Sequence, residues 1–167
     1  GGRAIDQHAD VARMLDEMDV LAVGGRGVAH LALVAMECGG SDDLVEALTP
    51  IAKVFCTDGA SVAADLGIQT LGGYGYLREY RIEQVARDAR ITRIYEGANG
   101  IHTLALSTRL MRMGSPIDAL EDMLADRDDL LGHLKDARAI VSALPDPSPI
   151  AHAFMGLAAE LVHQFVW

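Results

Sequence analysis

The chain has 167 residues, 50% of them hydrophobic, and its 24 acidic against 14 basic residues give a formal net charge of −10. This length suits one domain that buries a core without metal or disulfide support. The acidic balance and the absence of a Lys/Arg cluster argue against nucleic acid or an anionic membrane surface as the main partner. No apolar run approaches the roughly 18 residues that span a bilayer, and no signal peptide is apparent, so we expect a cytoplasmic protein without membrane insertion.

The few cysteines and the scattered histidines indicate neither a disulfide nor a metal site. Cys38 and Cys56 are in no metal-ligand spacing, and we expect both to be small buried side chains, as in a reducing compartment. The six histidines form no pair at ligand spacing beside carboxylates. We therefore expect no metal.

The chain is expected to be helical almost throughout, because its apolar residues recur at helical spacing and nothing indicates a strand. One long amphipathic helix is predicted from about Gln7 to Met36. Gly24, Gly25 and Gly27 lie inside it. Since each interior glycine costs about 1 kcal/mol relative to alanine, a close helix crossing or a kink is the expected compensation.

The next segment is predicted as two helices that meet at Thr49-Pro50. A short acidic helix covers residues 42–48. Thr49 and Pro50 then have the pattern of an N-cap and a first helical position, so a second helix is expected from Pro50 to Thr70. A short helix is predicted near residues 82–89.

The C-terminal half continues with a helix near residues 99–113, a stop at Gly114-Ser115-Pro116 and one helix to about Ala143. A stiff proline-rich linker at residues 145–149 precedes a last helix. The apolar face of that helix reaches almost to Trp167 without a stop signal, which indicates that the natural protein continues. The expected apolar faces are Ile101, Leu104, Thr108 and Met111 in the first of these helices, and Ile150, Phe154, Leu157, Leu161 and Phe165 in the last.

Two glycine-containing stretches interrupt the helical pattern and are interpreted as site loops. They are Gln69-Thr70-Leu71-Gly72-Gly73-Tyr74-Gly75-Tyr76 and Ile94-Tyr95-Glu96-Gly97-Ala98-Asn99-Gly100. Glycine permits positive φ and close approach of the backbone to a ligand, and the start of a following helix offers unpaired N–H groups. The first stretch lacks the spacing of a dinucleotide fingerprint, and by itself it also fits a helix-terminating turn.

Glu96 is the candidate for chemistry because it lies between an aromatic residue and a glycine, just before a helix start. In a partly apolar pocket it would be a useful base near neutral pH. The alternative is a solvated first-turn acid favoured by the helix dipole. Its local features alone favour the second interpretation.

The order of these pieces resembles the C-terminal helical domain of the acyl-CoA dehydrogenase flavoproteins. The resemblance rests on the stretch 69–76, on Glu79-Tyr80, on residues 87–91 and on residues 94–97, taken together at these separations. It implies an all-α, up-and-down four-helix bundle over residues 1–114. The stretch from His8 to Leu15 is similar to that of a subgroup of the family whose chains carry an extra helical segment after the bundle. This resemblance implies that residues 115–167 begin such an extension.

The resemblance also implies a FAD-dependent acyl-CoA dehydrogenase of fatty acid and lipid metabolism. Glu96 would take the α-proton of an acyl-CoA while the β-hydrogen leaves as hydride to FAD, giving trans-2-enoyl-CoA, and Gly97 would approach the thioester. The implied partners are an electron-transfer flavoprotein or similar acceptor and further copies of the chain, as a dimer or larger homo-oligomer. The implied cofactor-binding residues are Gln69, Thr70, Leu71, Gly72 and Gly73 toward the FAD of a neighbouring subunit, and Ile94, Ala98, Asn99 and Gly100 toward the subunit's own FAD.

Two departures limit what the resemblance implies. Ala98-Asn99-Gly100 stands where many members of the family have Thr-x-Gln, which leaves only backbone contacts to FAD at these positions. The family's N-terminal helical domain and middle β-domain are absent, so we expect the isolated chain to be inactive. The alternatives are a non-catalytic helical module for assembly and an acyl-CoA oxidase, in which oxygen is the electron acceptor.

Overall fold

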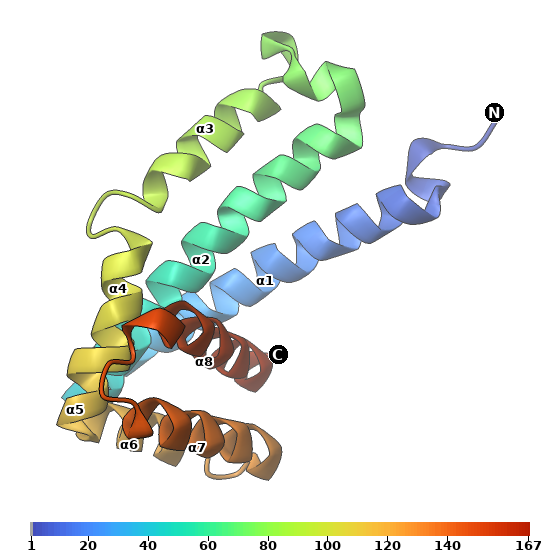
Figure 1. Ribbon diagram of the computed structural model, residues 1–167. Helices are drawn as coiled ribbons and strands as arrows, with labels where there is room; N and C mark the ends of the chain where they lie inside the picture. Colours follow the sequence, from blue (N-terminus) through green and yellow to red (C-terminus); the bar gives the residue numbers. More distant parts are fainter. Residues whose placement is uncertain (1) are drawn as a thin grey trace.

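The computed structural model describes residues 2–167, and these contain helices and no strand. After a short 3-10 helix η1 (Ile5–Gln7), the long helices α1 (Ala9–Glu37) and α2 (Asp42–Leu71) run antiparallel, and α3 (Ile82–Thr92) returns alongside α2 (Figure 1). Two short 3-10 helices, η2 (Gly72–Tyr76) and η3 (Arg78–Tyr80), join α2 to α3.

The chain then continues from α4 (Asn99–Ala105) through a π-helical turn η4 (Leu106–Leu110) into α5 (Met111–Met113). The remaining elements are α6 (Ser115–Met123), α7 (Asp128–Ala143), the 3-10 helix η5 (Ser148–Ile150) and α8 (Ala151–Val166). In Figure 1, α6 and α7 lie at the end of the bundle away from the N-terminus, and α8 packs between them and the pair α1 and α2. The all-α up-and-down architecture is therefore confirmed.

The predicted break at Thr49-Pro50 is wrong, because α2 continues through it as one helix. Pro50 is buried inside α2 between the fully buried Leu48 and Ile51. The Thr49 hydroxyl donates to the Val45 carbonyl at 2.7 Å instead of capping a new helix. A proline inside a helix costs about 3 kcal/mol, and burial of the apolar side chains around Pro50 offsets this cost.

The structure also corrects the second half of the expected helix pattern. The single helix predicted to Ala143 is two helices, since the chain turns at residues 124–127 and the acidic pair Asp128 and Asp129 begins α7. Acidic residues in the first turn of a helix are favoured by its dipole. The apolar face assigned to Ile101 and Leu104 is exposed by 64% and 43%. The buried side instead contains Thr103, Leu106, Ser107 and Leu110.

The glycines in α1 mark a close crossing with α8, and α1 remains one continuous helix. A Cβ atom on Gly24 would lie 2.2 Å from Nε2 of His163, and one on Gly27 would lie 3.0 Å from Cγ2 of Val166. The His163 ring itself is fixed between Phe55 and Trp167, with ring centroids 4.9 and 5.9 Å away. The expected close crossing is confirmed, and the crossing helix is the last one of the chain.

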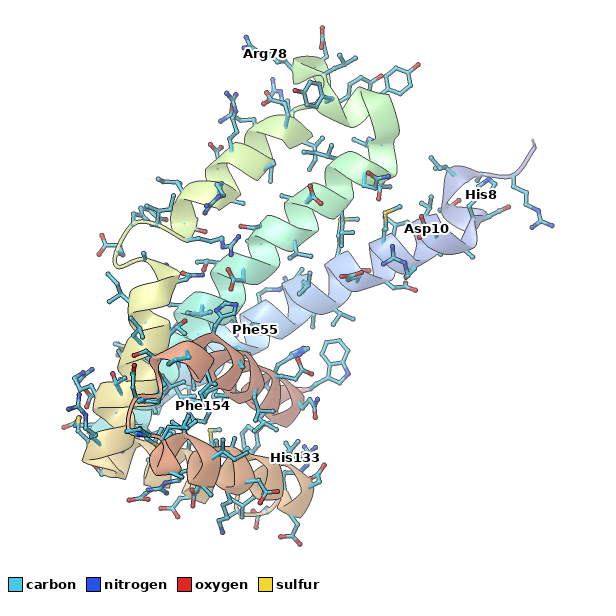
Figure 2. All side chains as sticks on the ribbon, in the orientation of Figure 1. His8, Asp10, Phe55, Arg78, His133 and Phe154 are labelled. Atoms are coloured by element: carbon cyan, nitrogen blue, oxygen red, sulfur yellow. The ribbon has the colours of Figure 1, made fainter. Side chains whose placement is uncertain are left out.

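The apolar face of α8 is covered by the chain itself. Phe154 and Leu161 are only 4% and 3% exposed, and Phe154 lies between α8 and α7 (Figure 2). One hydrophobic cluster joins residues of α1, α2, η4, α6, α7 and α8, so the core continues across Gly114. The division into a bundle of residues 1–114 and an extension of residues 115–167 stays a prediction.

Both cysteines are less buried than expected. Cys38 is exposed because it is the C-cap of α1, and Cys56 is half-buried in α2, where its thiol donates to the Gly25 carbonyl at 3.3 Å and burial raises its pKa. Contrary to the expectation that no apolar segment could span a bilayer, α1 is long and apolar enough to do so by length and composition. A core helix of a soluble protein meets the same criterion, and here α1 packs along α2.

We predict that Gly24→Ala destabilises the protein and that Gly25→Ala does not. The added methyl at position 24 would meet the fixed His163 ring, and overpacking of this kind costs about 1–3 kcal/mol. At position 25 the nearest atom, Sγ of Cys56, would be 3.9 Å away, so only the helix propensity gain of about 1 kcal/mol remains. Thermal unfolding of the two variants beside the parent protein is the measurement. Equal melting temperatures for the two variants would show that the crossing is not tight.

Candidate functional site

The two glycine-containing loops lie at opposite ends of α3 (Figure 1). Because α3 has 11 residues, the helix separates them by roughly 16 Å. The structure therefore does not bring residues 69–73 to Glu96 within one chain. It presents two separate loops, one after α2 and one before α4.

The three glycines of the first loop differ in backbone conformation and in the space around them. Gly72 ends α2 with φ 59° and ψ −139°, a backbone conformation that is accessible essentially only to glycine. A Cβ on the buried Gly75 would lie 2.5 Å from the Ile68 carbonyl oxygen. Gly73 has no atom within 4 Å of a Cβ and no positive φ, so nothing within the chain requires a glycine there. Gln69, Leu71 and both Gly72 and Gly73 are exposed, and Thr70 is half-buried.

The second loop, residues 93–98, carries Glu96 in an unusual backbone conformation. Glu96 and Gly97 have consecutive positive φ angles, 54° and 88°. For a residue with a side chain this region is sparsely populated, so the surrounding structure must hold it. His102 provides one such support, since its Nε2 lies 3.1 Å from the Glu96 carbonyl oxygen and donates to it when that nitrogen carries the proton. A Cβ on Gly97 would lie 2.8 Å from the same nitrogen.

The loop leaves polar groups available to a ligand. Glu96 is exposed, and no salt bridge within residues 2–167 involves its carboxylate. The backbone N–H groups of Glu96, Gly97, Ala98 and Gly100 have no acceptor in the same part of the chain, whereas Asn99 N–H donates to the Arg93 carbonyl at 3.1 Å. Gly100 has no atom within 4 Å of a Cβ, and Ile94 at the start of the loop is exposed. The loop thus combines a free carboxylate with free amide donors.

A cluster of polar side chains on α2 lies beneath this loop. Lys53 Nζ donates to the Thr92 carbonyl at 2.8 Å and to Oδ1 of Asn99 at 2.5 Å. Oδ1 of Asp58 accepts from Nδ2 of Asn99 at 2.9 Å and pairs with Nε of Arg93 at 2.6 Å. Burial lowers the pKa of Lys53; the Asp58 charge raises it, and that of Arg93 lowers it further.

The sequence motifs do not include Lys53, Asp58 or His102. A usable signal was present for Lys53, since it is one of two lysines in the chain and lies within the apolar run of residues 51–55. Lysine inside such a run is rarely buried without a partner. Asp58 and His102 carry no comparable signal, because polar residues on helices are mostly solvated.

Arg87 of α3 and Arg93, the C-cap of α3, each form an ion pair with a carboxylate. Nε of Arg87 lies 3.2 Å from Oε2 of Glu83, and Arg93 pairs with Asp58. Over residues 2–167, no group of three or more His, Cys, Asp or Glu side chains could hold a metal ion.

Comparison with known proteins places this helical chain in a family. Residues 1–111 match the family model described as "Acyl-CoA dehydrogenase, C-terminal domain". The chain is 42% identical over 106 residues to the 3-methylmercaptopropionyl-CoA dehydrogenase of Ruegeria pomeroyi. The aligned residues cover 58% of this chain and 18% of that protein. It is 34% identical over 124 residues to the very long-chain specific acyl-CoA dehydrogenase of Mus musculus, covering 74% of this chain and 19% of the relative.

The chain therefore belongs to the acyl-CoA dehydrogenase family and corresponds to its C-terminal helical domain. A solved structure titled "Bd2924 apo-form" has the same fold, with a TM-score of 0.87 over 99% of this chain and 34% of the other, at 19% identity. The chain spans about a fifth of the length of the two relatives named above.

Proposed function

We propose that this chain supplies the catalytic base and part of the cofactor site of a FAD-dependent acyl-CoA dehydrogenase, which converts an acyl-CoA thioester to trans-2-enoyl-CoA. The observation that carries the proposal is Glu96: an exposed carboxylate without an ion-pair partner in the described chain, held at positive φ beside free amide donors. This arrangement lies within the segment that matches the family's C-terminal domain. The named relatives act on acyl-CoA thioesters of different kinds.

The chemistry required of Glu96 is removal of a weakly acidic proton. Its carboxylate accepts the α-proton of the thioester, and the electrons of the broken C–H bond move toward the thioester carbonyl. The N–H groups of Glu96 and Gly97 are available to donate to that carbonyl oxygen and so stabilise the developing enolate charge. When bound, FAD supplies the acceptor for the β-hydride.

The residues present fit a bound FAD in two places. Gly73 and Gly100 each have open space where a Cβ would point, so a ligand can approach the backbone closely. In the proposed arrangement residues 69–73 contact the FAD of a neighbouring subunit, and Ile94, Ala98 and Gly100 line the subunit's own. The amide and N–H of Asn99 already have partners within the chain, which makes its contribution to FAD indirect.

The proposal extends to the partners. The substrate is an acyl-CoA, the assembly is a homo-oligomer of at least two subunits in the cytoplasm, and reduced FAD passes its electrons to an electron-transfer flavoprotein or similar acceptor. Shared cofactor contact requires the oligomer, since the two glycine loops of one chain are separated by α3.

We predict that Glu96→Gln in the full-length protein retains FAD and acyl-CoA binding yet slows reductive bleaching of the flavin by several orders of magnitude. The amide keeps the shape of the side chain and removes its basicity. Anaerobic mixing with a panel of acyl-CoA thioesters measures this half-reaction without any electron acceptor. The matched control is Glu37→Gln, which alters an exposed glutamate at the end of α1. Bleaching at the parental rate in Glu96→Gln would remove Glu96 from the mechanism.

We also predict that Gly73→Val lowers flavin content per chain without lowering thermal stability. A Cβ at position 73 has no atom of its own chain within 4 Å, so we expect the valine to block chiefly a ligand that approaches from outside. Gly132→Val is the control, since Gly132 on α7 also has open space around it and lies outside both loops. Flavin absorbance per protein and melting temperature are measured together for each variant. Full flavin content in Gly73→Val would leave the first loop as a turn with no cofactor role.

A further inference from the structure

We infer that Lys53 and Asp58 of α2 are positioning residues that hold the loop of residues 93–98, and with it Glu96, in the geometry that proton abstraction requires. The inference rests on the proposed function for Glu96. It assigns a role in that reaction to two side chains that carry no catalytic group of their own.

Each of the two side chains contacts both ends of the loop. Lys53 Nζ donates to the Thr92 carbonyl, where α3 ends, and to Oδ1 of Asn99, where α4 begins. Asp58 pairs with Arg93 at the first end and accepts from Nδ2 of Asn99 at the second. The loop is therefore tied at both ends to the same helix, by one cation and one anion.

The amide of Asn99 is the shared partner, and its hydrogen-bonding capacity is used within the chain. Its oxygen accepts from Lys53, and its nitrogen donates to Oγ1 of Thr57 and to Asp58, both at 2.9 Å. Thr57 in turn donates to the Lys53 carbonyl at 2.8 Å. Thr57 lies four residues after Lys53, on the same face of α2, and Asp58 follows Thr57 directly, so all three side chains reach Asn99. The Asn99 side chain therefore cannot rotate without breaking several hydrogen bonds.

The electrostatics make the network stiff. Lys53 and Asp58 are half-buried, and hydrogen bonds to ionised groups are about twice as strong as neutral ones. Removal of the Asp58 charge leaves Lys53 and Arg93 without their nearby anion, and removal of Lys53 leaves the Thr92 carbonyl and Oδ1 of Asn99 without their cationic donor. A base must be held within about 0.5 Å of its productive position, so a looser loop lowers the rate.

The network is not what packs α3 against α2. Ile82 of α3 lies against Gly67 of α2, where a Cβ would be 3.0 Å from Cδ1 of Ile82. The cluster of Lys53 and Asp58 lies at the other end of α3, at the strained loop with two consecutive positive φ angles. Loss of the cluster should therefore loosen the loop while α2 and α3 stay packed.

The test compares Lys53→Met and Asp58→Asn with matched controls in the full-length protein. Lys135→Met and Asp65→Asn alter exposed residues, one the other lysine of the chain and one on α2 itself. The first measurement is the anaerobic rate of flavin reduction at saturating acyl-CoA. We expect about a 10- to 100-fold loss in Lys53→Met and Asp58→Asn, with KM and flavin content near parental values, and no loss in the controls. Lys53→Arg keeps the positive charge and can donate to two acceptors, so it should recover part of the rate of flavin reduction.

The second measurement is amide hydrogen exchange, which does not depend on activity. We expect residues 93–102 to exchange at least about tenfold faster in both variants, with α1 and the rest of α2 unchanged. Parental rates of flavin reduction and exchange in both variants would overturn the inference. Faster exchange throughout the chain would also overturn it, because the residues would then serve folding alone. If the parent protein reduces no flavin with any acyl-CoA, the proposed function fails, and local exchange still decides whether the pair holds the loop.

Discussion

The continuous helix α2 is the constraint on which the remaining structure depends. Helices α1, α3, α4, α6 and α8 all pack against it. Its first half buries Leu48, Pro50 and Ile51 in the core, its middle carries Lys53 and Asp58 under the Glu96 loop, and its end at Gly72 forms the other glycine loop. A break at Pro50 would separate the first part of the helix from the other two, so the continuity of α2 through its buried proline keeps all three parts on one rigid element.

At the crossing of α1 and α8, a side chain of one helix fills the space that a glycine of the other helix leaves open. His163 occupies the space beside Gly24 and is held between Phe55 and Trp167. This contact packs the last helix of the described chain against the middle of α1, and the core extends across the predicted boundary at Gly114. The last helix is thereby stabilised by the bundle, which buries Phe154 and Leu161 fully and Ile150, Leu157 and Phe165 in part.

Prediction from the sequence succeeded for the architecture where periodicity and turn residues agree. The ends of α1, the start of α3, the stop at Gly114 and the glycine crossing all follow from local rules, whereas α3 continues to Thr92, past its predicted end near residue 89. It failed where tertiary burial outweighs local preference: Pro50 stays in a helix, and Thr103 and Ser107 point inward while Ile101 and Leu104 point out. The Glu96 loop could be located from its motif, but its support could not, because Lys53 and Asn99 are 46 residues apart in sequence and meet only through the fold.

The position of the two glycine loops at either end of α3 has a consequence for how the length of this helix can vary. Each added residue in α3 lengthens the helix by about 1.5 Å and also turns everything after it by about 100°. A single-residue insertion would swing Glu96 away from the side on which Lys53 and Asp58 can reach both loop ends, whereas an insertion near a whole turn would restore the direction but add about 5 Å. The helix therefore acts as a fixed spacer between the two loops, and both its length and its phase are set by what must happen at its ends.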